Sequence, residues 1–508
     1  MHRRSFAALI AACLVLAAAC SSGGKDVGST TRTAKPASTA TTGTTVPSTR
    51  AIHWRRCNGG GQCGELTVPR DYAQPNGPTI KVALLRYPAT RPKERIGPLL
   101  VNPGGPGASA VEFLRDDLSI FPSSLRNRFD LVAVDSRGTG ATIPVHCNAD
   151  LDKVNAVDNT PNTPEEQQHI ADVAKQLAAG CEERSGAILP YVSTQSSARD
   201  LDQVRAALGA PKLTYVGYSY GTYLGALYAK FFPDRVRAFV LDGAVDPTLS
   251  SADASLQQSA AFEKDLQAFF ADCAKRTSCA FHNGGDPATA FDALIAKIDG
   301  APLPTGTNRR GRRLGPGEAD LGIAQALYGG TAAWPDLATA LSEAQDGDGT
   351  ALLELSDEYT DRQPDGSYGT QEPGFWAIAC IDSPPVPGGL DGLHALAATA
   401  KQSAPHFGEA NVYLGTACDF WPVPPVADPN PIHATGAPPI LVIGTTGDPA
   451  TPFTWAESLT KQLDSGRLLI ANGEQHTSFL GAQNSCVDEK VIKYLVQLQP
   501  PATGTRCN

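Results

Sequence analysis

Several patterns that identify common protein classes are missing from this chain of 508 residues. None of its twelve cysteines occurs in a Cys-x-x-Cys pair, which argues against a structural zinc site. Basic residues are in the minority, with 42 Lys and Arg against 52 Asp and Glu, so nucleic acid is not expected as a partner. No Gly-Lys-Ser or Gly-Lys-Thr follows the glycine-rich stretch at 103–107, so a phosphate cradle is not expected there. We therefore expect neither a metal nor a cofactor.

The N-terminus has an apolar run, Phe6–Ala19, that is too short to cross a membrane comfortably. Two arginines precede it, and a basic start followed by about 7–15 apolar residues is typical of a signal peptide. Leu16–Ser21 resembles a bacterial lipobox, which predicts a signal peptide at 1–19 and lipidation of Cys20. Cys13 fits the same pattern, but cleavage there would leave only about six apolar residues.

The segment that follows consists of Ser, Thr, Ala, Gly and Pro without periodicity. Such a segment cannot bury enough apolar surface to fold. We predict that residues 20–50 are a lipidated flexible tether, which would hold an exported domain at the outer face of the cell membrane. The export route stays open, because Arg3–Phe6 faintly resembles a twin-arginine signal.

The number of cysteines supports export. Loss of Cys13 with the signal and of Cys20 to lipid leaves ten cysteines, an even number that an oxidising compartment would pair in five disulfides. The sequence cannot fix their connectivity, so we predict the simplest arrangement, pairing between neighbours along the chain. The predicted pairs are Cys57–Cys63, Cys147–Cys181, Cys273–Cys279, Cys380–Cys418 and Cys486–Cys507.

Short apolar strands alternate with helical patterns over much of the chain, which indicates a mostly parallel sheet. The predicted strands lie at 65–69, 79–87, 97–102, 129–135, 212–216, 236–241, 439–444 and 467–471, and a closing helix lies at 487–498. Between about residues 247 and 435 the pattern is helical and apolar strands are missing. We therefore predict a core in two parts, 51–247 and 437–508, and a large helical insertion at 248–436.

Gly217–Gly221 is the only Gly-x-Ser-x-Gly in the chain, and it lies between a predicted strand and an apolar helix at 222–232. This is the arrangement of the nucleophile elbow, in which a sharp turn exposes a serine at a helix N-terminus. Side chains at the two glycines would collide with the neighbouring strand and helix. We predict an α/β-hydrolase fold in which Ser219 is the nucleophile and the insertion is a lid that excludes water.

A nucleophilic serine needs a base, and the base needs an orienting carboxylate. In this fold the three follow in the order Ser, Asp or Glu, His. His476 is the only histidine after Ser219 in a loop directly behind a strand of the predicted core, so we predict it as the base. Asp448 ends the preceding strand and is the predicted acid, with Asp242, at the end of an earlier strand, as the second choice.

An oxyanion hole requires two backbone N–H donors. We predict that Tyr220, directly after the nucleophile, supplies one donor. Gly105 in the glycine turn after the strand at 97–102 is the predicted second donor, because prolines at 103 and 106 stiffen that turn.

Taken together, several motifs resemble the exported tripeptidyl aminopeptidases, a lipoprotein-rich branch of the proline-iminopeptidase-like α/β-hydrolases. These motifs are NPGGPG, DSRGTG, GYSYGTYLGALYA, LDGAVDP, FWAIACID, GTTGDPATP and EQHTSF. The resemblance runs from about residue 55 to the C-terminus and implies the same triad. Departures are small: Ala110 replaces a frequent glycine, and Ala141-Thr142 stands where serine often ends the second motif.

The resemblance implies a serine exopeptidase that releases tripeptides from the free N-termini of peptides or proteins. Such an enzyme must bind an α-ammonium, which requires carboxylates in a partly desolvated pocket. We predict Asp246, Glu372 and Asp382 as candidates, at the lid entrance and in its late aromatic part. Some close relatives are named carboxylesterases, so a carboxylesterase or lipase is the alternative. A catalytically idle binding protein is disfavoured, because every triad element is present.

Overall fold

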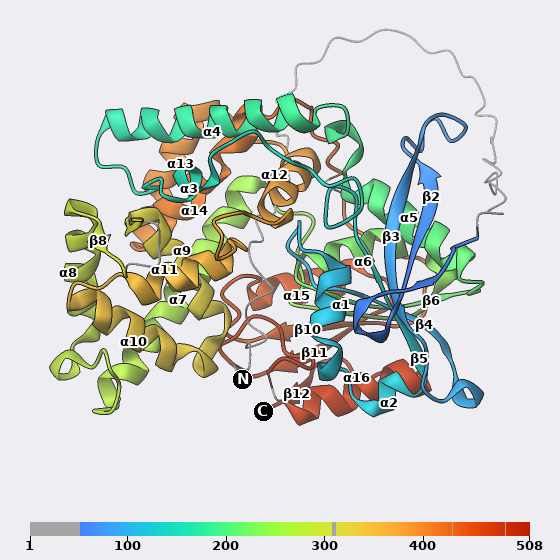
Figure 1. The fold of residues 1–508 in the computed structure, drawn as a ribbon. Coiled ribbons are helices and arrows are strands. Elements are labelled where there is room, and N and C mark those ends of the chain that lie inside the picture. The colour runs from blue at the N-terminus through green and yellow to red at the C-terminus, as the bar shows by residue number, and fades with distance from the viewer. Residues whose placement is uncertain (1–50, 307–310, 429, 483) are drawn as a thin grey trace, which may run out of the picture.

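The computed structural model describes residues 51–306, 311–428, 430–482 and 484–508. The predicted signal peptide, the tether and Cys20 lie outside the described residues. Figure 1 shows two parts, a central sheet flanked by helices and a helical lid beside it.

Ten of the described strands form one sheet in the order β1-β2-β3-β5-β4-β6-β7-β10-β11-β12. Their pairing is antiparallel from β1 to β5 and parallel from β5 through β4 to β12. The strands are β1 Arg55–Arg56, β2 Gln62–Pro69, β3 Thr79–Tyr87, β4 Gly97–Asn102, β5 Phe129–Val134, β6 Leu213–Tyr218, β7 Val236–Asp242, β10 Ile440–Thr445, β11 Gly466–Ala471 and β12 Thr505–Cys507. The predicted α/β-hydrolase fold and the eight predicted strands are confirmed, while β1 and β12 were not predicted.

Apolar side chains on successive strand residues explain how the sheet is held. Leu99 and Leu100 of β4 are both buried but belong to two different hydrophobic clusters, because neighbouring strand residues point to opposite faces. One cluster includes residues of α5 (Thr194–Ala207), α6 (Tyr220–Phe231) and α15 (Phe453–Gln462). The other includes residues of α1 (Ala110–Asp116) and α16 (Ser485–Gln497). Burial on both faces is typical of a parallel sheet.

The lid is built mainly from the segment between β7 and β10. Its helices are α7 Ser251–Lys275, α8 Pro287–Gly300, α9 Pro316–Tyr328, α10 Trp334–Gln345, α11 Thr350–Tyr359, α12 Gln371–Asp382, α13 Gly389–Ser403, α14 Gly408–Leu414 and the 3-10 helix η10 Gly415–Phe420. A short ribbon of β8 (Leu303–Pro304) and β9 (Arg313–Leu314) lies among them. Phe269, Trp334 and Leu337 belong to a core of the lid's own.

Another insertion, which is the first of the two along the chain, also belongs to this lid. Helices α3 (Leu151–Asn155) and α4 (Pro164–Ser185) come from between β5 and α5, a region that the sequence analysis assigned to the core. Leu151 and Leu177 pack in one cluster with Trp376 of α12 and Ala417 of η10, and Figure 1 shows α4 lying across the helical part. The lid is therefore formed by two chain segments, and their junction lies over α12.

All five predicted disulfides are confirmed. Cys147–Cys181 closes the first insertion and Cys380–Cys418 ties α12 to η10, so both insertions are cross-linked internally. Cys486–Cys507 ties α16 to the last strand of the sheet.

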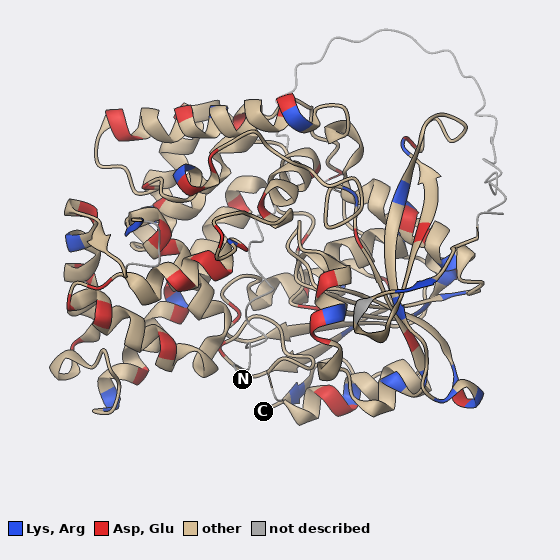
Figure 2. Ribbon diagram, viewed as in Figure 1, with Lys and Arg blue, Asp and Glu red and all other residues tan. Residues whose placement is uncertain are grey.

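Among the described residues, no helix combines the length and apolar character needed to cross a membrane. Acidic residues recur along the lid helices in Figure 2, and several of the carboxylates considered below come from that part of the chain.

Candidate active site

Ser219 lies between β6 and α6 with φ 54° and ψ −127°, a backbone conformation that costs a non-glycine residue about 1–3 kcal/mol. A Cβ at Gly217 would come within 2.3 Å of the Gly221 carbonyl oxygen, and one at Gly221 within 2.7 Å of Asn102 Oδ1. Only glycine fits these two positions, as the steric argument predicts. The Ser219 N–H donates to the Asp242 carbonyl at 2.8 Å, and Thr222 Oγ1 donates to the Ser219 carbonyl at 2.6 Å. These bonds hold the strained turn at the carboxyl end of β6.

His476 and Asp448 lie together at the carboxyl ends of neighbouring strands. His476 Nδ1 donates to the two Asp448 carboxylate oxygens at 2.8 and 2.9 Å. Asp448 is fixed in turn by the N–H groups of Ala450 and Thr451, at 2.9 and 2.8 Å, and by the Thr451 hydroxyl. Because Nδ1 carries the proton toward Asp448, Nε2 is the nitrogen that can accept one. Nε2 is buried and has no hydrogen-bond partner within the part of the chain that the structure describes.

Asp242, the second choice for the acid, has a different environment. Its Oδ2 accepts the N–H groups of Ser478 and Phe479 at 2.9 and 2.7 Å, two and three residues after the histidine. Burial raises the pKa of Asp242 to about 6. The next residue, Gly243, lies against the imidazole, since a Cβ there would be 3.0 Å from His476 Cε1. Asp242 thus positions the histidine loop, while Asp448 contacts the imidazole itself.

The glycine turn after β4 packs directly against the elbow. A Cβ at Gly104 would lie 2.9 Å from Ser219 Cβ and 3.3 Å from the Tyr220 nitrogen, so glycine is required for this approach. The Gly104 N–H donates to Asn102 Oδ1 at 3.0 Å. Gly105 and Tyr220 stay predictions as the two oxyanion donors.

The DSRGTG motif (135–140) stabilises the segment that follows this glycine turn. Asp135 accepts the Ser109 hydroxyl and the Val111 N–H at 2.8 and 3.0 Å, which fixes the start of α1 directly after the glycine turn. Arg137 is fully buried and makes two hydrogen bonds to Asp200, at 2.6 and 2.8 Å. A buried charge needs such a partner to be tolerated. The motif thus holds in place the start of α1, next to the glycine turn.

Lid helices contact the loop that carries His476 and the turn that carries Asp448. The backbone N–H of His476 donates to the Tyr328 carbonyl of α9 at 3.0 Å. The rings of the two residues pack edge to face, with their centroids 5.3 Å apart. Gln258 of α7 donates to the Ala450 carbonyl at 2.6 Å, next to the Asp448 turn. The lid is therefore part of the site's architecture.

Two adjoining pockets lie in the lid, and one of them reaches the glycine turn. One, of about 560 Å³, is lined by residues including Tyr328 and Asp320. The other, of about 590 Å³, is lined by residues including Pro106 of the glycine turn and Glu372 of α12. Both are lined by the same four residues where they meet, Asn159, Leu321, Tyr359 and Leu414. Together they form a cleft within the lid that reaches Pro106 of the glycine turn and Tyr328, whose ring packs on His476. Neither Ser219 nor His476 lines either of these two pockets.

The structure places the three predicted ammonium-binding carboxylates differently. Glu372 lines the cleft, and burial raises its pKa to about 7, against the hydrogen bond from Asn155. Asp246 is buried where the chain enters the lid and accepts hydrogen bonds from Thr248 and Gln462. It lines neither of the two pockets.

Asp382 is also buried away from these two pockets. It accepts the Thr194 N–H at 2.9 Å and the Thr194 hydroxyl, and that hydroxyl also contacts the Tyr220 hydroxyl. Burial raises the pKa of Asp382 to about 7. Asp382 therefore fixes the Thr194 side chain, which in turn contacts the hydroxyl of Tyr220, the residue after Ser219.

Two polar residues of the cleft were missed by sequence reasoning. Asp320 of α9 lines the pocket of about 560 Å³; its Oδ2 is buried without a hydrogen-bond partner among the described residues, and burial raises its pKa to about 8. Asn155 of α3 lines the other pocket. No motif surrounds either residue, and only the three-dimensional packing of the two insertions brings them to the cleft.

The fold and this arrangement define the class of protein: an α/β-hydrolase with a serine at the elbow and a histidine–carboxylate pair beside it. Family models agree, one described as alpha/beta hydrolase fold over residues 97–283 and one as TAP-like protein over residues 404–507.

The sequence similarity to curated relatives extends over nearly the whole chain. Serine protease Hip1 of Mycobacterium tuberculosis is 39% identical over 482 residues, which cover 90% of this chain and 91% of that protein. Carboxylesterase B of Mycobacterium tuberculosis is 36% identical, covering 88% and 86%. Tripeptidyl aminopeptidase of Streptomyces lividans is 32% identical, covering 88% and 83%. The chain belongs to this TAP-like family of α/β-hydrolases.

The choice between the two acids leads to a test. We expect Asp448→Asn to keep the fold but to reduce kcat by roughly 10⁴-fold, because the imidazole loses the carboxylate that sets its tautomer. Asp242→Asn keeps an oxygen that can accept the loop N–H groups, so we expect a far smaller loss. Steady-state kinetics with circular dichroism as the folding control would measure both. A nearly silent Asp448→Asn beside an inactive, folded Asp242→Asn would reverse the assignment.

Proposed function

We propose that this protein is a serine exopeptidase that releases short peptides, tripeptides in the first place, from free N-termini through an acyl-enzyme on Ser219. The observation that carries the proposal is the cleft, which joins the glycine turn to a carboxylate, Glu372, held in a desolvated part of the lid. The relatives named serine protease and tripeptidyl aminopeptidase support the same activity.

The chemistry follows from the positions of the groups. Ser219 Oγ would attack the scissile carbonyl carbon while His476 Nε2 takes its proton, and Asp448 would stabilise the imidazolium that forms. The N–H groups of Tyr220 and Gly105 would stabilise the oxyanion. The imidazolium would then protonate the leaving amine as the C–N bond breaks, and water would hydrolyse the ester on Ser219. Ser219 is only 1% exposed, so bulk water would be excluded from the reacting atoms.

A carboxylate that lines the cleft would bind the free N-terminus of the substrate. A carboxylate that has lost hydration on burial can be stabilised by a charge-assisted hydrogen bond from an ammonium. Such a hydrogen bond contributes about 1.5–3 kcal/mol to binding. Glu372 is the first candidate, and Asp320, with a buried unpartnered oxygen, is the second. Their distance from the nucleophile would then set how many residues are removed.

The test compares a free and an N-acetylated tripeptide p-nitroanilide. We expect the free amine to be preferred, and Glu372→Gln to reduce this preference roughly 10- to 150-fold, the equivalent of about 1.5–3 kcal/mol. Because the raised pKa of Glu372 is about 7, its charge is present above that pH and lost below it, so the preference should fall from pH 7.5 to 6. The preference is measured as the ratio of the two kcat/KM values, in which any titration that affects both substrates equally cancels.

The exposed lid residue Asp391 offers a matched control, since Asp391→Asn removes a carboxylate outside the cleft. Equal turnover of free and acetylated substrate by the wild-type protein would exclude the aminopeptidase activity. It would leave the second candidate, a carboxylesterase acting on acyl esters, which uses the same chemistry and is favoured by the relative named carboxylesterase B.

We further propose that the protein is exported and held at the outer face of the cell membrane by lipid on Cys20. The lipobox-like sequence supports this anchor, and the five disulfides are suited to an oxidising compartment.

Cell fractionation tests the anchor. Cys20→Ser should move the protein from the membrane to the soluble fraction, because two or three acyl chains anchor firmly whereas an unlipidated tether does not. Cys13→Ser is the matched control and should leave the protein in the membrane. Release by Cys13→Ser in place of Cys20→Ser would refute the predicted lipidation site.

A further inference from the structure

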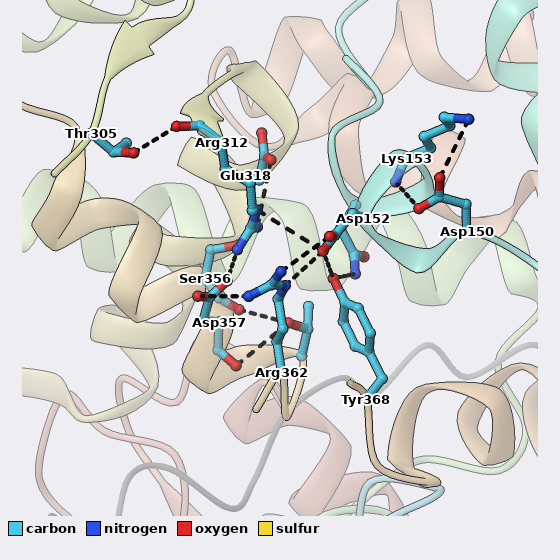
Figure 3. A network of polar contacts seen from close by, with 12 residues as sticks. Asp150, Asp152, Lys153, Thr305, Arg312, Glu318, Ser356, Asp357, Arg362 and Tyr368 are labelled. Atoms are coloured by element: carbon cyan, nitrogen blue, oxygen red, sulfur yellow. Dashed lines mark hydrogen bonds and ion pairs between the residues drawn. The ribbon is translucent and has the colours of Figure 1, made fainter. Parts of the chain in front are cut away.

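A cluster of ion pairs joins the two insertions of the lid (Figure 3). Asp152 comes from α3 in the first insertion, and its carboxylate accepts two hydrogen bonds from Arg362, at 2.6 and 3.1 Å, and one from the Tyr368 hydroxyl at 2.7 Å. Arg312 lies 3.9 Å from the same carboxylate and also pairs with Asp357 of α11. We call these five residues the clasp.

The clasp has the features of a rigid junction. The side chains of Arg312, Arg362 and Asp357 are only 12%, 6% and 9% exposed, so their interactions are screened far less than those of surface pairs. Asp152 is more accessible, yet partial burial is outweighed by the bonds from Arg362 and Tyr368, which hold its pKa below the ordinary value. Asp152 is the clasp's only contribution from the first insertion.

The clasp is connected to the cleft along the chain. Arg362 and Tyr368 pair across a short turn, and α12 begins three residues after Tyr368. Just before α12, the Thr370 hydroxyl accepts the Gly140 N–H at 2.9 Å. A Cβ at Gly107 would lie 2.1 Å from the Gln371 carbonyl oxygen, so the first turn of α12 rests on the glycine turn. Glu372 belongs to this same helical turn.

A second connection runs through α3. Asn155 follows Asp152 by three residues, which places both on one face of the helix. Its amide donates to Glu372 Oε2 at 3.1 Å and approaches the Tyr368 hydroxyl at 3.5 Å. Fixing α3 through Asp152 therefore fixes the donor that orients the Glu372 carboxylate in the cleft.

We propose that Asp152 is a positioning residue for substrate recognition: by clasping α3 to the turn before α12, it holds Asn155 against Glu372 and so presents that carboxylate to the substrate's ammonium. The inference rests on the proposed aminopeptidase function. It assigns the preference for a free N-terminus to the junction of the two insertions as well as to the carboxylate itself.

The experiment compares Asp152→Asn with the matched control Asp150→Asn. Asp150 lies at the start of the same helix, where it pairs with Lys153 and does not belong to the clasp; asparagine can replace it as a helix cap. We expect Asp152→Asn to raise KM for the free tripeptide substrate roughly tenfold, a loss of about 1.4 kcal/mol. kcat and the kinetics of the N-acetylated substrate should be unchanged, and Asp150→Asn should resemble the wild type.

Two further variants keep the test decisive if Asp152→Asn does not fold. Tyr368→Phe removes only a hydroxyl of the clasp and should shift KM for the free substrate in the same direction. Asn155→Ala should reproduce the effect, and adding Asp152→Asn to it should cause little further loss, because both act through Glu372.

The outcomes separate the inference from the proposed function. If the wild-type protein does not discriminate between the free and the acetylated substrate, the aminopeptidase function fails. If the wild type discriminates and the clasp variants discriminate equally well, only the inference fails. An equal fall in kcat for both substrates would show a general structural role and would also contradict the inference.

Discussion

The backbone of Ser219 is the constraint on which the rest of the active-site structure depends. A positive φ at a serine persists only where its surroundings enforce it. Here Gly217 and Gly221 provide the space, the Asp242 carbonyl binds the Ser219 N–H, and Gly104 closes against the elbow from the neighbouring strand. The carboxylate of Asp242 in turn binds the loop that follows His476. Asp242, at the end of β7, thus holds both Ser219 and the loop that carries His476.

The lid is attached to this centre. Its residues Tyr328 and Gln258 contact the loops that carry His476 and Asp448. Its construction from two insertions matters because α3 and α12 come from different parts of the chain and meet at the cleft. The relatives include proteins named serine protease and carboxylesterase. We propose that the lid is the part that distinguishes between such substrates.

Local signals in the sequence predicted what depends on local structure. The strand at 97–102 is apolar and bounded by turns, and the elbow glycines are required by one turn, so both were predictable. The number of disulfides and their pairing were also predicted correctly. The role of Asp382 was not predictable, because it depends on Thr194, 188 residues away. Asp320 and Asn155 were missed for the same reason: long-range packing of the lid carries no local signature.

Transfer of a tripeptidyl group to Ser219 can be tested by rapid-quench intact-mass spectrometry during turnover of a peptide with a free N-terminus. We expect a transient mass increase equal to the acyl group of the first three residues, mapped to Ser219 by proteolytic fragments and absent in Ser219→Ala. An adduct on another residue, or one that persists in Ser219→Ala, would contradict it.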